Sequence, residues 1–142
     1  MTATIPRRWT VELDGIRWLP RMIDKARMRE RGELGTYLLG HSPVDFALLT
    51  RLGVTTEEFA AIVNDAPGDD DVLAALRARG FDEARVRRWS ESFPRRYRHY
   101  ILMWDLDEGY RRPTTVQAVA IAAFRPFERP AMALLRFARR AP

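Results

Sequence analysis

The chain has 142 residues, with 24 lysine and arginine residues against 19 acidic residues and a formal net charge of +5. At this length one domain is expected, with a core large enough to fold without covalent cross-links. Because the sequence has no cysteine, disulfides, a cysteine-ligated zinc site and a thiol nucleophile are excluded.

Residues 1–18 show no clear periodicity and are predicted to form an N-terminal arm. This segment is too polar for a signal peptide, and the longest apolar run, residues 116–124, is far shorter than the roughly 20 residues of a membrane helix. We therefore expect a cytoplasmic protein without a membrane span. Asp14-Gly15 is typical of a turn, and Trp9 and Leu13 are expected to pack the arm.

A first helix is predicted from about Pro20 to Arg31. Proline suits the first turn of a helix because its missing N–H would have no partner there. Gly32 is expected to end the helix in the left-handed conformation. Four apolar residues follow the helical spacing and predict one buried stripe, namely Leu19, Met22, Ile23 and Ala26.

Three short helices are predicted next, each from a signal at its start. Ser42 caps the first of them, in which Phe46 is expected to be buried. Thr55 and Glu58 have the spacing of a capping box for the second. Three consecutive acidic residues, 69–71, open the third, where a cap and favourable helix-dipole charges explain them better than a metal site.

The remaining sequence is also helical in pattern. Apolar residues keep helical spacing over 82–104, so two helices, or one helix kinked at Pro94, are expected. Thr114 and Pro130 begin two further helices of a C-terminal extension, residues 110–142, which we expect to pack on the core. The basic edge of the last helix has an alternative role as a homodimer contact. The predicted fold class is all-α: a single-domain bundle, residues 1–142, of about seven short helices.

The most distinctive part of the sequence lies within residues 13–59. It contains, in this order, Leu19-Pro20-Arg21-Met22-Ile23-Asp24-Lys25-Ala26-Arg27, Gly32-Glu33-Leu34-Gly35-Thr36-Tyr37, Pro43-Val44-Asp45, Leu52-Gly53-Val54 and Glu58-Phe59. This order resembles a family of small bacterial proteins described as a domain of unknown function. The resemblance implies a helical protein and no particular reaction.

One candidate site lies at the corner between the first helix and the segment that follows it. The acid–base candidates are Asp24, Tyr37 and His41, and the ligand-binding candidates are Lys25, Arg27 and Asp45. Cationic side chains can hold a carboxylate or phosphate, and histidine and tyrosine can donate hydrogen bonds or transfer protons. In the structural alternative, Asp24 pairs with Arg21 or Arg27, Tyr37 packs in the core and Asp45 supports a helix start.

A second candidate is the segment Arg85–Tyr100, in which arginines alternate with aromatic residues. Nucleic-acid surfaces use arginine for phosphate and aromatic rings for base stacking. The aromatic residues here follow the apolar stripe of a helix, however. Core packing with a solvated arginine face is therefore the simpler interpretation, and nucleic acid is not the favoured partner.

The sequence has no recognisable catalytic motif, and neither a metal nor another cofactor is expected. The first hypothesis is a non-catalytic module that binds an anionic small molecule or a protein partner beside the Asp24–Tyr37 corner. An alternative is a small cofactor-free enzyme that uses Asp24, Tyr37 and His41 for acid–base chemistry. A second alternative is a nucleic-acid binder that uses the Arg85–Arg98 face.

Overall fold

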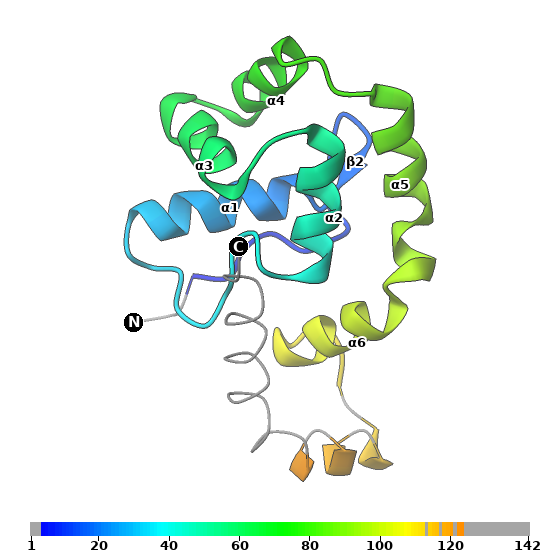
Figure 1. Cartoon of the computed structure of the whole chain (residues 1–142). Helices are drawn as coiled ribbons and strands as arrows, with labels where there is room; N and C mark the ends of the chain where they lie inside the picture. Colours follow the sequence, from blue (N-terminus) through cyan, green and yellow to red (C-terminus); the bar gives the residue numbers. More distant parts are fainter. Residues whose placement is uncertain (1–3, 113, 117, 121, 124–142) are drawn as a thin grey trace, which may run out of the picture. The chain divides into compact units, whose positions relative to one another are not determined.

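The computed structural model describes residues 4–112, 114–116, 118–120 and 122–123, and these residues are predominantly helical (Figure 1). The predicted all-α class is confirmed. The described helices and strands are β1 (Glu12–Leu13), β2 (Ile16–Arg17), α1 (Leu19–Glu30), α2 (Pro43–Leu52), α3 (Thr56–Asp65), α4 (Asp69–Ala78), α5 (Glu83–Arg96) and α6 (Arg98–Asp107). Further helical residues occur at 115–116, 118–120 and 122–123, whereas the helix expected to begin at Pro130 lies outside the described residues.

The chain divides into two compact units, with the boundary after Arg98. The first unit contains all of the predicted site residues. Within it α1 contacts α3 and β1, α3 contacts α4, and α5 contacts both α2 and β2 (Figure 1). The predicted apolar stripe of α1 is confirmed, because all four of its members are buried: Leu19, Met22, Ile23 and Ala26. None of the described helices is both long and apolar enough to cross a membrane.

The N-terminal segment contains a short hairpin where the sequence indicated only an arm with a turn. Asp14 and Gly15 have φ angles of 47° and 77°, as a two-residue turn between antiparallel strands requires. Ser90 of α5 covers the open edge of this hairpin, since its hydroxyl accepts from the Arg17 N–H at 2.8 Å and donates to the Gly15 carbonyl at 3.0 Å. Arg87 of α5 also donates to the Asp14 carbonyl at 2.8 Å, so Ser90 and Arg87 together attach the hairpin to α5.

Local sequence signals place the starts of the middle helices correctly. The Ser42 hydroxyl accepts from the Asp45 N–H at 3.1 Å. Thr55 and Glu58 form the predicted capping box, with bonds of 3.1 and 2.8 Å. The prediction for Phe46 was wrong, because its side chain is 59% exposed. At about 100° per residue, the buried residues of α2 span a sector that ends at Leu49, and Phe46 lies outside it.

The expected interruption of the long helical segment lies just after Pro94 rather than at it. Pro94 lacks the N–H that would bond to the Ser90 carbonyl, and this carbonyl accepts from Arg17 Nη1 at 3.2 Å instead. Helix α5 therefore continues through Pro94. It ends before Tyr97, and α6 begins at Arg98, so the segment forms two helices.

The burial of Ile23 gives a first test of this fold. Ile23 is 0% exposed, so Ile23→Ala should lower the free energy of unfolding by about 2–5 kcal/mol in chemical denaturation. Ile5→Ala is the matched control, because Ile5 is 48% exposed, and its loss should stay below about 1 kcal/mol. An equally small loss of unfolding free energy in both variants would show that Ile23 does not lie on the buried face of α1.

Candidate functional site

Lys25 and Asp45 form a buried ion pair between α1 and α2. Lys25 Nζ lies 2.6 and 2.7 Å from the two carboxylate oxygens of Asp45, and it also donates to the Leu38 carbonyl at 2.9 Å. The two side chains are 4% and 0% exposed. An ammonium group carries three donors on one nitrogen, whereas a guanidinium spreads its donors over three nitrogens in a plane. Lysine therefore suits three acceptors that converge on one point.

The Asp45 carboxylate also accepts hydrogen bonds from outside the ion pair. Trp18 Nε1 donates to Oδ1 at 2.7 Å, and the Gly40 N–H donates to Oδ2 at 2.9 Å. Gly40 has φ 78°, and a Cβ at this position would lie 2.0 Å from the Thr56 hydroxyl. Glycine is thus required where the loop approaches Asp45. Asp45 connects the start of α1, the loop before α2 and α2 itself.

Trp18 supports this arrangement at a conformational cost. It precedes α1 with φ 71°, a left-handed conformation that costs a non-glycine residue roughly 1–2 kcal/mol. The hydrogen bond to Asp45 fixes one end of the indole, and its ring lies 5.6 Å from the ring of Phe93. The guanidinium of Arg21 lies 5.2 Å from the Trp18 ring and 5.6 Å from the Tyr37 ring. The contacts of Trp18 therefore hold it in this conformation.

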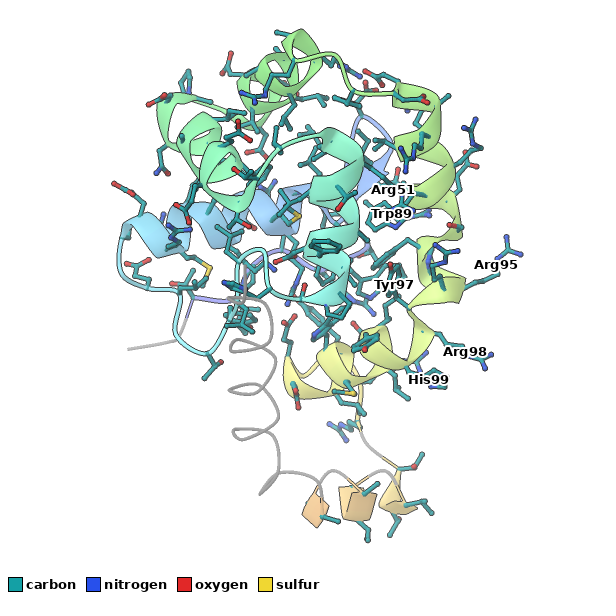
Figure 2. All side chains as sticks on the ribbon, viewed as in Figure 1. Arg51, Trp89, Arg95, Tyr97, Arg98 and His99 are labelled. Atoms are coloured by element: carbon teal, nitrogen blue, oxygen red, sulfur yellow. The ribbon has the colours of Figure 1, made fainter. Side chains whose placement is uncertain are left out.

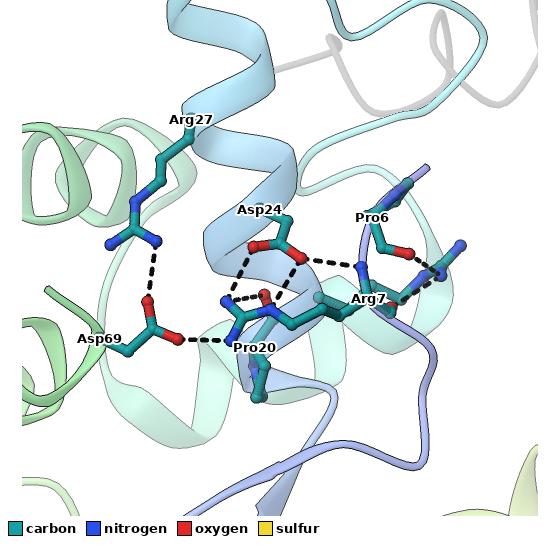
Figure 3. A network of polar contacts seen from close by, with 7 residues as sticks. Pro6, Arg7, Pro20, Asp24, Arg27 and Asp69 are labelled. Atoms are coloured by element: carbon teal, nitrogen blue, oxygen red, sulfur yellow. Dashed lines mark hydrogen bonds and ion pairs between the residues drawn. The ribbon is translucent and has the colours of Figure 1, made fainter. Parts of the chain in front are cut away.

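A second polar network joins the N-terminal segment to α1 and α4 (Figure 3). The backbone N–H, Nε and Nη2 of Arg7 donate to the Asp24 carboxylate at 2.8, 2.9 and 2.8 Å. Arg7 Nη1 also lies 2.6 Å from Asp69, which accepts from Arg27 at 2.8 Å. The structural alternative thus paired Asp24 with the wrong residue, since its partner is Arg7 rather than Arg21 or Arg27.

Asp69 has a perturbed pKa within this network. Burial alone would raise the pKa of its carboxyl, but hydrogen bonds from Arg7 and Arg27 outweigh burial and lower the pKa below 3.8. The same contacts, led by the hydrogen bond to Asp24, raise the pKa of Arg7. The charges of this network therefore neutralise one another within the protein.

Tyr37 and His41 are members of neither the Lys25–Asp45 ion pair nor the ion pairs of the Arg7 network described above. Tyr37 is half-buried, and its ring lies beside Arg21. His41 is exposed, and its charge helps to lower the pKa of Glu57, for which the hydrogen bond from Arg29 is the larger cause. The six predicted site residues are thus divided between a buried Lys25–Asp45 pair, the Asp24–Arg27 network and two separate positions. Their catalytic and ligand-binding roles stay predictions.

A hollow of about 230 Å³ lies between α1 and α3, smaller than the roughly 300–1,000 Å³ of ordinary ligand pockets. Its lining residues are Ala26, Arg29, Glu30, Glu57, Ala60, Ala61 and Asn64. Arg29 pairs with Glu57 at 2.7 Å, and Asn64 donates to Glu30 at 3.0 Å. None of the six predicted site residues lines this hollow, and its polar side chains bond to one another.

A group of cations without a carboxylate partner among the described residues lies on α2 and α5 of the first unit. We call it the basic surface, and it consists of Arg51, Arg85, Arg88, Arg95 and Arg96. The four arginines on α5 are exposed, and within the described part of the chain their guanidinium groups form neither an ion pair nor a hydrogen bond. In Figure 2, Arg51 and Trp89 lie on the side of α5 that faces α2, whereas Arg95 projects away.

Arg51 is the member of the basic surface that belongs to α2. Its guanidinium lies 5.7 Å from the ring of Trp89, and Nη1 donates to the Ala47 carbonyl at 2.7 Å. Burial lowers the pKa of Arg51 and the charges of Arg85 and Arg96 lower it further, against an opposing effect of Tyr97. Among the described residues, no carboxylate shifts this pKa. Arg51 thus lies among like charges that nothing described here neutralises.

The fold and its polar contacts define a small, predominantly helical protein built on a buried lysine–aspartate pair. The chain belongs to the family described as Domain of unknown function (DUF5069), whose sequence model matches residues 3–116. This match confirms the resemblance to a domain family of unknown function and extends it beyond residues 13–59. None of the curated proteins compared matches the chain.

Sequence reasoning missed four residues that matter in the structure: Arg7, Trp18, Arg51 and Asp69. Asp69 was interpreted only as part of a helix start, and it also forms ion pairs with two distant arginines. Arg7 lies in a segment without periodicity, so nothing local indicates its partners. For Trp18 the sequence did offer a signal, since a tryptophan just before a predicted helix is expected to be buried. A buried indole N–H usually needs an acceptor.

The Lys25–Asp45 pair can be tested by removing one partner and then both. Lys25→Met leaves the Asp45 carboxylate buried without its cation, and it should lower the free energy of unfolding by about 3–5 kcal/mol. Adding Asp45→Leu should recover part of this loss in a double-mutant cycle, because the uncompensated charge is then removed. Unchanged stability in Lys25→Met would instead show that Lys25 is free to serve a ligand.

The lowered pKa of Asp69 makes a prediction about pH. A carboxyl whose pKa is depressed on folding stabilises the protein above its unfolded pKa, near 3.8, and this stabilisation is lost as pH falls through the lower folded pKa. The free energy of unfolding should therefore decrease less between pH 6 and about pH 3 in Asp69→Asn than in the unchanged protein. Asp70→Asn is the control, since Asp70 is exposed and should leave the slope unchanged. Identical slopes for both variants would contradict the network.

Proposed function

We propose that the chain is a non-catalytic module that binds an anionic small molecule or a protein partner, with the basic surface as the face that meets the anion. The supporting observation is the difference between two groups of arginines in the first unit. One group is neutralised by carboxylates and contains Arg7, Arg27, Arg29, Arg77 and Arg79. The other group is the exposed α5 part of the basic surface, which has no such partner among the described residues.

A cluster of exposed like charges raises the energy of the folded protein and attracts anions from solution. An anion that binds there relieves this repulsion, and arginine offers it paired N–H donors in a fixed plane. The basic surface therefore has the chemistry to bind an anion, and we propose it in place of the Asp24–Tyr37 corner as the location of the first hypothesis. No proton transfer is needed for this role.

The Asp24–Tyr37 corner offers a ligand fewer unpaired charges than the basic surface does. Lys25 already has Asp45 as its partner, and Asp24 is occupied by Arg7. A cofactor-free enzyme would need Asp24, Tyr37 and His41 to meet at one substrate position. The contacts of Asp24 with Arg7 instead favour a structural role, so binding at the basic surface is the better proposal. The predicted cytoplasmic location and homodimer contact stay predictions.

Thermal denaturation against a panel of small molecules tests this function. Anionic compounds should raise the melting temperature at low ionic strength, because a ligand at about 100 times its Kd stabilises the folded state by roughly 2.7 kcal/mol. Cationic compounds of the same size are the control and should have no effect. The proposal is wrong if neither carboxylates, phosphates nor acidic polypeptides change the melting temperature.

A further inference from the structure

We propose that Arg51, Arg85 and Arg96 form a binding site beside Trp89 for a ligand with two or more linked phosphoryl groups. This inference rests on the proposed anion-binding function and assigns it particular residues and a ligand class. The three arginines come from two helices that contact each other, α2 and α5. All of them belong to the first unit of the chain.

The spacing along α5 places the arginines in one row. Residues 85, 89, 92 and 96 follow one another at intervals of four, three and four, which keeps them on the same side of a helix. Arg51 of α2 lies against Trp89, between the two ends of this row, at 5.7 Å from its ring. Arg85 and Arg96 are separated by about 16 Å along the helix axis. A ligand with several linked anionic groups would face all three cations, whereas a single anion would face fewer.

The acidic residues of the two helices leave this row unneutralised. Asp45, the single acidic residue of α2, is buried with Lys25. On α5, Glu83 pairs with Arg77, and Glu91 lies roughly 160° around the helix from Trp89. Within the described part of the chain, the side chains that perturb Arg51 are Arg85, Arg96 and Tyr97, and none of them is a carboxylate. A polyanion would therefore meet three cations without displacing a carboxylate of either helix.

Trp89 adds a second, independent observation. It is 3% exposed, and its Nε1 is the one buried side-chain donor without a hydrogen-bond partner among the described residues. Buried polar groups are normally satisfied, so an orphaned donor points to an acceptor that the protein itself does not supply. The guanidinium that lies beside the Trp89 ring belongs to Arg51. A ligand oxygen held by Arg51 would thus lie beside a tryptophan whose indole N–H has no acceptor among the described residues.

Phosphoryl groups match this set of donors better than carboxylates. A phosphoryl group carries up to two negative charges and three strong acceptor oxygens. Arginine binds phosphate through two parallel N–H bonds, and the indole N–H offers a further donor. Linked phosphoryl groups therefore supply both the charge and the number of acceptors that three arginines and one indole require.

Calorimetric titration of the full chain at low ionic strength tests the site. The probes are orthophosphate, tripolyphosphate and citrate, with a single-stranded oligonucleotide to distinguish free phosphoryl compounds from a nucleic-acid backbone. Tripolyphosphate should bind at least about tenfold more tightly than orthophosphate or citrate. Arg85→Gln with Arg96→Gln should weaken this binding by at least about tenfold for each arginine. Both positions are exposed, so the double variant should fold normally.

The matched control is Arg111→Gln with Arg112→Gln, which removes the same charge from two other exposed arginines. This control should change the affinity by less than about threefold, the size expected for a nonspecific charge effect. The indole N–H resonance of Trp89, assigned from its loss in Trp89→Phe, should shift on addition of tripolyphosphate. These two results together would show that the ligand binds at the row of arginines on α5 and not nonspecifically to other positive charges of the protein.

Three outcomes would overturn the inference. Equal weakening in the two double variants would reject the row but leave the anion-binding function in place. Tighter binding of citrate than of tripolyphosphate would reject the phosphoryl class and also leave that function in place. No binding of any anion by the unchanged chain would reject both. Tight oligonucleotide binding that weakens steeply with salt would support phosphoryl recognition with nucleic acid as its source.

Discussion

The buried contact between Lys25 and Asp45 is the interaction on which the first unit depends. Removing two charges from water is costly, and their attraction offsets this cost only where the remaining donors and acceptors are also satisfied. Here the Leu38 carbonyl accepts a further hydrogen bond from the Lys25 ammonium, while N–H groups of Trp18 and Gly40 donate to the Asp45 carboxylate. One ion pair thereby fixes the entry to α1, the loop before α2 and the first turn of α2.

The Arg7 network extends the same principle to the N-terminal segment. Arg7 binds Asp24 of α1 and Asp69 of α4, so a segment with little regular structure is attached to two helices. Arg27 shares Asp69 with it. These charges are used to assemble the protein, and together with the buried pair they account for most of the residues first considered as a site. The cations of the basic surface are different because the described structure gives them no such use.

Local interactions could be read from the sequence, and distant ones could not. The caps at Ser42 and Thr55 depend on residues within three positions, and each one forms as its sequence signal indicates. The partners Lys25 and Asp45 are 20 residues apart. Both were among the predicted ligand-binding residues, but only the folded chain shows that they meet. Phe46 was misplaced for a related reason, since the face that a short helix buries is decided by its neighbours.

Lys25 is the single lysine of an arginine-rich sequence, and the donors of its ammonium are arranged differently from those of a guanidinium. A lone ammonium can place three donors at one buried point, and Lys25 does so. Guanidinium groups spread their donors in a plane, which suits partners arranged side by side, as in the shared contacts of Arg7. Carboxylates supply such partners to most arginines near α1, α3 and α4, whereas no described carboxylate does so for the row on α5. Among the described residues, this planar donor set and the buried indole N–H beside it both lack an acceptor, which supports the proposal that another molecule supplies one.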